Sequence, residues 1–556
     1  MLQPKILTTL KNYNRQQFVS DLIAGIIVGI VALPLAIAFG IASGVSPQNG
    51  LITAIVAGFI ISLLGGSRVQ IGGPTGAFIV VVYGVVDKFG LDGLLIATFM
   101  AGVMLVLMGL FRLGTVIKFM PYPVVVGFTS GIAVVIFSSQ IKDFLGLPID
   151  KVPADFFEKW VIYLQYIGNI NWFAFGMALT SVLLIVYFPR ISRTIPGSLA
   201  AIVLTTAATL IWNIPVETIG SRFGQIASVL PTLQIPEIES FEVLKSLIQP
   251  AFTIAMLGAV ESLLSAMVAD GIIGGNHRSN MELVAQGAAN MIVPLVGGIP
   301  ATGAIARTMT NIKNGGRTPV AGIVHALTLL VIMLFLGKWA QLIPMPCLAG
   351  ILVMVAYNMS EWRSFRDLLS HPKSDVAVLL TTFFLTVVLD LTIAIQIGVI
   401  MALVLFVKRT AETSEIQVIK NQFNAETSDE LTDSGDNLSL ALPPDTEVYE
   451  INGPFFFGAA NKFDEALRRV GSRRPKVRII RMSKAPFIDS TGLNNLRSLC
   501  KKSKTEQIQV ILAEVNEQPL SVILKAGIDQ LLGENNICPS IETALERARQ
   551  LTGSSG

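Results

Sequence analysis

Two short segments rich in Gly and Pro interrupt the apolar runs of this chain, at residues 72–77 and 297–307. In each segment Gly and Pro end the preceding structure, and a Thr then opens a new helix. A helix start carries about half a positive charge and up to four N–H groups without an intrahelical partner. Two helix starts that face each other would bind an anion without any enzyme chemistry. The anion-binding residues predicted on this basis are Pro74, Thr75, Gly76, Ala77, Ala301, Thr302, Gly303 and Ala304.

Three polar residues lie in or near apolar runs close to these segments. Glu261 is inside the run 249–270, where a carboxylate is costly unless it is paired or protonated, so it is a functional candidate. Ser265 follows four residues later on the same helical face. A buried Arg307 would balance an anion or pair with Glu261, because Arg has no accessible neutral form. The alternatives are a structural carboxylate, a lone helical serine, an arginine that reaches the cytoplasmic surface, and two segments that are ordinary loops.

The composition indicates a polytopic membrane protein. Of the 556 residues, 52% are hydrophobic and 14% are charged, whereas soluble domains carry about 25% charged residues. The three Cys and three His residues are scattered without the spacing of a metal site. We therefore expect no metal and no cofactor. No nucleophile–His–acid set or nucleotide-binding loop indicates an enzyme, so we expect no catalytic residue, and no nucleic-acid partner either.

Apolar runs of roughly spanning length recur fourteen times, in two sets of seven with a half-length run third in each set. An odd repeat length makes the second set enter the membrane from the opposite side, so the halves are inverted. The predicted fold is a polytopic all-α membrane domain of 7+7 inverted repeats with two half-helices. The predicted spans are 22–43, 50–65, 75–87, 91–111, 122–142, 171–188, 195–213, 249–270, 281–297, 301–312, 318–337, 342–357, 375–390 and 391–407.

Loop charges predict the orientation of these spans. Lys and Arg gather in the loops on one side, with Lys338 as the main exception, whereas the long loops near 143–170 and 214–247 on the other side are acidic. The positive-inside rule places the basic side, and both termini, in the cytoplasm. The chain then divides into a cytoplasmic N-terminus (1–20), a transmembrane domain (21–410), a mobile polar linker (411–444) and a cytoplasmic α/β domain (445–552).

The α/β domain is predicted from short β-rich runs that alternate with amphipathic stretches. The strands are expected at 448–451, 477–482 and 508–513, and helices at 460–470 and 493–502.

The chain resembles the SulP family of anion permeases, the bacterial relatives of the eukaryotic sulfate and multi-anion exchangers and of prestin. The resemblance depends on the two broken helices, on residues 315–322 (Gly-Gly-Arg-Thr-Pro-Val-Ala-Gly), and on residues 487–493 (Phe-Ile-Asp-Ser-Thr-Gly-Leu), which look like the signature of a STAS domain. It implies a core domain that carries the substrate between the third and tenth spans, a gate domain, elevator-type transport and a homodimer. Residues 33–35 (Leu-Pro-Leu) depart from the Pro-Gln of many members, which puts a side-chain amide contact to the anion in question.

The resemblance also implies roles for individual residues. Glu261 matches the acidic residue that the family uses for cation coupling, where Glu suggests a proton, or an uncoupled role, rather than sodium. Ser265 would add a hydroxyl to this site, and Arg307 matches an arginine near the anion. Thr491, with Ser490 beside it, matches the residue that related STAS proteins phosphorylate. The alternative for this pair is structural, with Asp489 and Ser490 capping the following helix.

These observations predict a secondary active transporter of small anions of the sulfate, bicarbonate or dicarboxylate class in the plasma (inner) membrane. The predicted mechanism is proton-coupled symport. Alternatives are an uncoupled anion channel or exchanger of the same fold, and a nucleobase–cation symporter, which the soluble tail disfavours. A signalling protein anchored in the membrane would not need paired broken helices. The expected partners are the anion, a proton or sodium ion, the lipid bilayer, a second copy of the chain and an unknown cytoplasmic partner of the STAS domain.

Overall fold

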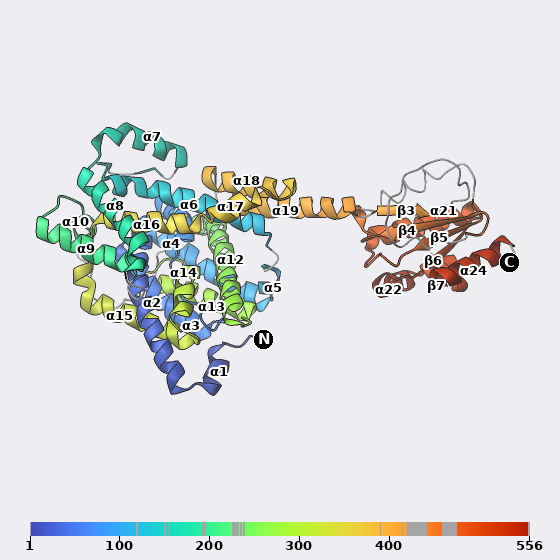
Figure 1. Ribbon diagram of the computed structural model, residues 1–556, viewed down its shortest axis with the longest axis horizontal. Coiled ribbons are helices and arrows are strands. Elements are labelled where there is room, and N and C mark those ends of the chain that lie inside the picture. The colour runs from blue at the N-terminus through green and yellow to red at the C-terminus, as the bar shows by residue number, and fades with distance from the viewer. Residues whose placement is uncertain are drawn as a thin grey trace. The chain divides into compact units, whose positions relative to one another are not determined.

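The computed structural model of the chain forms two compact units, Met1–Ala402 and Leu403–Gly556 (Figure 1). It describes residues 2–117, 120–149, 152–153, 155–191, 196–224, 233, 236, 240–389, 391–413, 415–419, 442–458 and 475–553. The predicted helix at 460–470 and residues 420–441 of the predicted linker lie outside the described residues.

All fourteen predicted spans occur as helices in the described part of the chain. The third and fourth spans are joined in α4, but Gly90 (φ 67°, ψ −170°) breaks the helix between them. The half-length predictions are therefore confirmed, since the third span ends near Gly90 and the tenth has only nine residues. The spans are α2 Arg15–Ala42, α3 Pro47–Leu64, α4 Ile79–Leu110, α6 Tyr122–Leu145, α8 Trp172–Tyr187, α9 Gly197–Trp212, α12 Ile248–Ile273, α13 Ser279–Ile292, α14 Ile305–Lys313, α15 Pro319–Ala340, α16 Met345–Met359, α18 Lys373–Val388 and α19 Leu391–Thr413.

Short elements connect these spans. They are α1 Ile6–Thr9, η1 Leu10–Asn12, η2 Gly76–Phe78, α5 Gly114–Ile117, α7 Phe156–Tyr166, η3 Ile167–Asn169, η4 Phe188–Arg190, α10 Ile219–Phe223, α11 Phe241–Ser246, η5 Val293–Val296 and α17 Trp362–Leu368. Seven helices of the described chain are long and apolar enough to cross a membrane on their own.

Local sequence signals place the ends of the spanning helices. Asn14 and Gln17 form a capping box at the start of α2, and Ser46 and Asn49 form one at the start of α3. These side chains satisfy N–H groups that the helix leaves unpaired. At the other end of a span, Gly146 ends α6 in the left-handed conformation that glycine adopts readily.

The spans pack as two groups. The first helix group contains α2, α3, α4, α12, α13, α14 and α15, and the second helix group contains α6, α8, α9, α16, α18 and α19. Packing pairs recur, with every helix replaced by its equivalent from the other half of the chain. The pair α4–α13 corresponds in this way to α15–α3, and the pair α6–α18 corresponds to α16–α8. This recurrence is what an inverted repeat requires, and the two groups match the predicted core and gate.

Glycines allow the closest approach within the first helix group. A Cβ added at Gly102 of α4 would lie 2.8 Å from the carbonyl oxygen of Gly287 in α13, and one at Gly287 would lie 2.6 Å from the carbonyl oxygen of Gly102. Because apolar lipid gives no hydrophobic drive for helix association, such close backbone packing is a main source of helix–helix stability in membranes.

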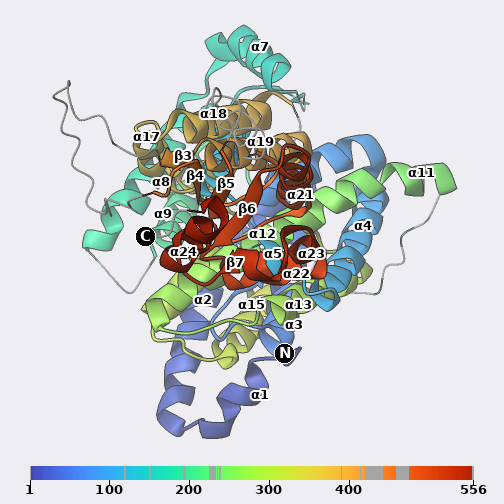
Figure 2. The same ribbon diagram turned by 90° about the vertical axis from the view of Figure 1, so that its right-hand side faces the viewer.

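The second unit is an α/β domain with one five-stranded sheet in the order β3-β4-β5-β6-β7 (Figure 2). The strand β3 is antiparallel to β4, and the other neighbours are parallel. Helices α21, α22 and α23 share an apolar core with one face of the sheet, and α24 packs on the other face. The bounds are β3 Glu415–Ile419, β4 Thr446–Asn452, β5 Val477–Arg481, β6 Gln509–Ala513, β7 Ile537–Cys538, α21 Ser490–Thr505, α22 Glu517–Lys525, α23 Ile528–Leu532, η6 Glu534–Asn536 and α24 Ile541–Thr552.

One difference from the sequence prediction lies at the start of this unit. Residues 411–413, which the sequence assigned to the linker, continue α19, and residues 415–419 form β3. The alternation of polar and apolar residues from Glu415 to Ile419 is typical of a strand. Along its whole length β3 pairs with residues 448–452 of β4. The interpretation of residues 411–413 and 415–419 as polar linker was therefore wrong.

Candidate anion-binding site

The two broken segments lie side by side in the first unit. Gly72–Gly73 (β1) and Thr302–Gly303 (β2) pair as antiparallel strands, with Gly72 opposite Gly303 and Gly73 opposite Thr302. The backbone N–H of Ala304 also donates to the carbonyl of Ile71 at 2.9 Å. The prediction that the starts of the two half-helices approach each other is therefore confirmed.

Two glycines of this pairing lie against buried side chains. A Cβ at Gly303 would lie 1.4 Å from Nε2 of Gln70, and a Cβ at Gly73 would lie 2.3 Å from Nη1 of Arg307. Gly73 also has a φ of +147°, which residues other than glycine rarely adopt. A side chain at Gly73 would therefore strain the backbone, and one at Gly303 would displace the end of the Gln70 side chain from its place.

Both half-helices begin directly after the pairing. Thr75 precedes η2, which leads into α4, and Ala304 precedes α14. Neither residue caps its helix with a side chain, so the N–H groups of the first turn remain available to a ligand. In the first segment these groups belong to Gly76 and Ala77, and anion binding by these two residues stays a prediction.

In the second segment the available donors begin later than the sequence suggested. The N–H of Ala301 donates to Oδ1 of Asn290 at 2.8 Å, and the hydroxyl of Thr302 donates to the carbonyl of Gly258 at 2.9 Å. These residues hold the segment in place, as does Ala304 through Ile71. The first turn of α14 therefore offers the N–H groups of Ile305 and Ala306, which sequence reasoning missed.

Glu261 lies in α12 beside the start of the first half-helix. The hydroxyl of Thr75 donates to its Oε2 at 2.8 Å, and the residue as a whole is partly buried. A structural carboxylate in this protein looks different: Glu282 is fully buried and accepts from the N–H groups of Gly66 and Ser67 at 2.8 and 3.0 Å. Within the described residues Glu261 has no such backbone donors, so the structural alternative for it has little support.

Arg307 is buried, with 2% of its surface exposed. Its guanidinium donates to the carbonyl of Pro74 and, at 3.4 Å, to that of Gly72. The alternative of a side chain that reaches the cytoplasmic surface is therefore wrong. Among the ion pairs of the described chain, none joins Arg307 to Glu261 or to another carboxylate. The positive charge thus lies against backbone carbonyls of the opposite broken segment. Glu261 is near enough to attract it, but the described residues form no salt bridge between the two.

Ser265 contacts α14 beyond its first turn and does not lie beside the start of either half-helix. Its hydroxyl lies 3.3 Å from Oγ1 of Thr308, which also accepts from the N–H of Ile71 at 3.1 Å. Ser265 is 1% exposed, so its observed partner is a hydroxyl of α14. Thr308 was not predicted, although a Thr one residue after Arg307 is a visible signal.

Buried amides hold the broken backbone where helical hydrogen bonds are lost. Asn290 bonds both the N–H and the carbonyl of Ala301 at 2.8 Å, and Asn311 donates to the carbonyl of Val69 at 2.8 Å. Gln70 donates to the carbonyl of Ser262 at 3.2 Å. Backbone that is not helical needs such hydrogen-bond partners inside a membrane. In the sequence, the Asn and Gln residues within apolar runs indicate where these partners lie.

The start of the first half-helix faces both helix groups. A Cβ at Gly76 would lie 2.9 Å from Sδ of Met359 in α16 and 3.3 Å from Cδ1 of Ile136 in α6. Phe39 of α2 lies next to the same point at 3.6 Å. Apolar side chains of the second helix group therefore pack against the position where an anion would sit.

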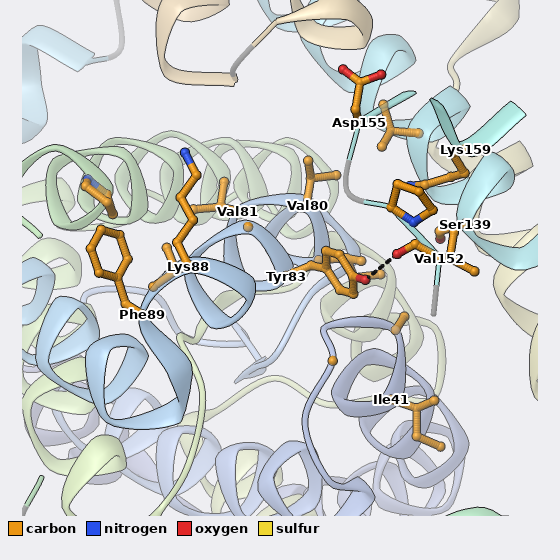
Figure 3. Close-up of a pocket in the computed structure, with 18 of the residues that line it drawn as sticks. Ile41, Val80, Val81, Tyr83, Lys88, Phe89, Ser139, Val152, Asp155 and Lys159 are labelled. Atoms are coloured by element: carbon orange, nitrogen blue, oxygen red, sulfur yellow. Dashed lines mark hydrogen bonds between the residues drawn. The ribbon is translucent and has the colours of Figure 1, made fainter. Parts of the chain in front are cut away.

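A cavity of about 790 Å³ lies between the two helix groups and is lined by residues of α2, α4, α6, α7, α10, α11 and α12 (Figure 3). It reaches Ile79, the first residue of α4. Charged residues of its lining are Lys88, Lys142, Asp143, Asp155, Lys159 and Arg222. We call it the charged cavity.

In the second unit, the proposed phosphorylation residues lie in the first turn of α21. Ser490 and Thr491 are exposed. Asp489 caps the helix, since its Oδ1 accepts from the N–H of Gly492 at 2.8 Å and its Oδ2 accepts from the N–H of Phe457 at 3.1 Å. The capping role belongs to Asp489, which leaves both hydroxyl residues accessible. No group of three or more His, Cys, Asp or Glu in the described chain could hold a metal ion.

Comparison with known proteins identifies the family. The model of the sulfate permease family matches residues 18–382, and the STAS domain model matches residues 437–544. Because the first match covers more than half of the chain, the chain belongs to the sulfate permease family. It is a multi-pass membrane transport protein and not an enzyme.

Individual relatives agree with this assignment. The "Putative sulfate transporter YvdB" of Bacillus subtilis is 42% identical over 527 residues, which are 95% of this chain and 97% of that protein. The transmembrane domain of a cyanobacterial bicarbonate transporter, BicA, is 32% identical with a TM-score of 0.63, covering 69% of this chain and 98% of that one. The structure of SLC26A9 has a TM-score of 0.87 at 18% identity, covering 99% of this chain and 93% of that one, and shows the shared fold.

Proposed function

We propose that this protein moves a small anion of the sulfate or bicarbonate class across the plasma membrane, by proton-coupled symport, with the anion held between the starts of the two half-helices. The observation that carries the proposal is the buried guanidinium of Arg307, which has no carboxylate partner in the described chain and lies against the paired segments. A buried charge without a direct ion-pair partner is unfavourable, and Glu261 attracts Arg307 without forming a salt bridge with it. A transported anion between the helix starts supplies the direct partner.

The charges of the site suit a divalent anion when Glu261 is protonated. Two helix starts contribute about half a charge each and Arg307 contributes one, which gives about +2. An ionised Glu261, bonded to Thr75 at 2.8 Å, lowers this sum to about +1. Binding of the proton and of the anion therefore favour each other, which is the thermodynamic basis of coupling. The anions named for relatives, sulfate and bicarbonate, support this substrate class.

The two helix groups support an elevator-type movement. Both broken segments belong to the first helix group, whereas Ile136 and Met359 of the second group pack against Gly76. A shift of the first group past these apolar side chains would carry the anion from one side of the membrane to the other. A homodimer, cytoplasmic termini and a cytoplasmic partner of the STAS domain at exposed Ser490 and Thr491 complete the proposal.

Uptake by proteoliposomes tests the function. The purified protein is reconstituted and given labelled sulfate, bicarbonate, chloride and dicarboxylates, with an inward pH gradient, an inward sodium gradient or neither. We expect concentrative uptake of one anion class that depends on the pH gradient. Saturable flux that no cation gradient drives uphill would instead support an exchanger, and non-saturating flux would support a channel.

A further inference from the structure

The charged cavity contains a buried ammonium group that the proposed transport site does not use. Lys159 of α7 lines this cavity and is only 5% exposed. Within the described residues no hydrogen bond or ion pair engages its ammonium. Asp155, one turn earlier, uses Oδ1 to accept from the N–H groups of Phe157 and Glu158 at 2.9 and 3.0 Å. Burial lowers the pKa of Lys159, and the charge of Asp155 opposes this effect.

A second donor lies one helical turn further along the same face of α7. Tyr163 is 3% exposed, and its hydroxyl has no hydrogen-bond partner in the described structure. Burial raises its pKa, as do the charge of Asp143 and the nearby Tyr83, both of which line the charged cavity. A neutral phenol is a hydrogen-bond donor, but Tyr163 itself is not among the residues that line the cavity.

The other cations of the cavity differ in their pairing. Arg222 is bound by Asp143, with Nη2 2.7 Å from Oδ1, and by Glu217. Lys88 of α4 is exposed and lies across the cavity from Lys159 (Figure 3). The cavity thus has a net positive lining in which the buried ammonium of Lys159 lacks a hydrogen-bond or ion-pair partner within the described chain.

We propose that the charged cavity holds a second anion site, centred on Lys159, for a small inorganic anion. The ammonium of Lys159 donates to the anion, and Lys88 adds to the attractive field. The site is distinct from the paired helix starts, because its donor comes from α7. Since the cavity extends to Ile79 at the beginning of α4, the second site concentrates anions on the path to the first. That last role rests on the proposed transport function, whereas the binding itself does not.

A cysteine reporter tests the site without any transport measurement. Ser139 lines the charged cavity on α6, and the native Cys347, Cys500 and Cys538 are buried. We would measure the rate at which Ser139→Cys reacts with negatively and positively charged methanethiosulfonates, at increasing sulfate concentrations. Removing one positive charge about 8 Å from the thiol lowers the ratio of the anionic to the cationic reaction rate by about fivefold. Sulfate should slow the anionic reagent in a saturable way.

Variants of Lys159 decide the outcome. In the Ser139→Cys protein, Lys159→Gln and Lys159→Met should each lower the anionic-to-cationic rate ratio by about fivefold and abolish protection by sulfate, whereas Lys159→Arg should retain both. Lys245→Gln, which removes an exposed lysine of α11 outside the cavity, should change neither. Met suits the buried position, so it provides a folded variant if Gln does not. Unchanged sulfate protection in either neutral variant would overturn the proposal, even if the paired helix starts still bind sulfate.

Discussion

The replacement Glu261→Gln separates coupled transport from passive conduction. Gln keeps the shape of the protonated carboxyl and an oxygen that accepts the 2.8 Å bond from Thr75. It removes the only negative charge among the groups that we assign to the site, so the sum over two helix starts and Arg307 stays at about +2 at every pH. Binding of a divalent anion should therefore survive, but it should no longer respond to protons.

The expected size of the effect follows from the charges. An ionised carboxylate about 5 Å from the anion weakens binding by about 3 kcal/mol for each unit of anion charge at an effective dielectric constant of about 20, which is at least about a hundredfold. Wild-type affinity should fall as pH rises and Glu261 loses its proton, whereas the affinity of Glu261→Gln should stay high and constant. One proton carried with each anion supports about tenfold accumulation for each pH unit of gradient at zero membrane potential.

The assay measures sulfate accumulation in proteoliposomes with the potential clamped by potassium and valinomycin. With an inward gradient of one pH unit, the wild type should concentrate sulfate about tenfold, and Glu261→Gln should only equilibrate it. Glu158→Gln, which alters an exposed carboxylate of α7, should behave like the wild type. Equal concentrative uptake by wild type and Glu261→Gln would refute the assignment of Glu261 as the proton carrier.

Three further predictions concern the fold and the second unit. Gly303→Ala places a Cβ 1.4 Å from Nε2 of Gln70 and should lower Tm markedly, whereas Gly84→Ala, with no atom within 4 Å, should not; a thermal melt of each purified variant would contradict the packing argument if both were neutral. Asp489→Ala removes the cap of α21 and should lower the stability of the helix start by about 1 kcal/mol. In the intact protein this should appear as faster hydrogen exchange in the first turn of α21, and unchanged exchange would exclude the capping role. Burial raises the pKa of Cys500 to about 12, so its thiolate fraction near pH 8 falls about a thousandfold. Maleimide should label Cys500 only after denaturation, and rapid labelling of the native protein would contradict this. The free energy of unfolding should also fall as pH rises above the pKa of the unfolded thiol, because the folded state retains the proton.

The broad architecture follows from the sequence because hydrophobic length and loop charge are local properties. Spans, their number and the glycine break at Gly90 can all be read from the run of apolar residues. The pairing of the segments was also accessible, since Gly and Thr recur at matching places in two halves. The strand β3 was missed because a five-residue alternation is short and lies in a polar region.

The exact donors of the site could not be read in the same way. Whether Ala304 or Ile305 offers a free N–H depends on which carbonyl the neighbouring segment presents, and that carbonyl belongs to Ile71, more than two hundred residues earlier. The roles of Thr308 and Asn290 likewise arise from long-range contacts. Sequence reasoning found the residues that are unusual in a membrane, such as Glu261, but not the side chains that hold the broken backbone.

The most direct test of the central claim is equilibrium binding of labelled sulfate and bicarbonate to purified protein with Arg307 altered. Arg307→Lys keeps the buried charge, Arg307→Gln removes it, and Lys313→Gln removes an exposed charge from the same helix. Size-exclusion chromatography confirms that each variant is folded. The proposed site predicts saturable binding that Lys313→Gln leaves unchanged, that Arg307→Lys weakens and that Arg307→Gln reduces by about a hundredfold. Equal affinity in folded Arg307→Gln and wild type would contradict an anion site between the two half-helices.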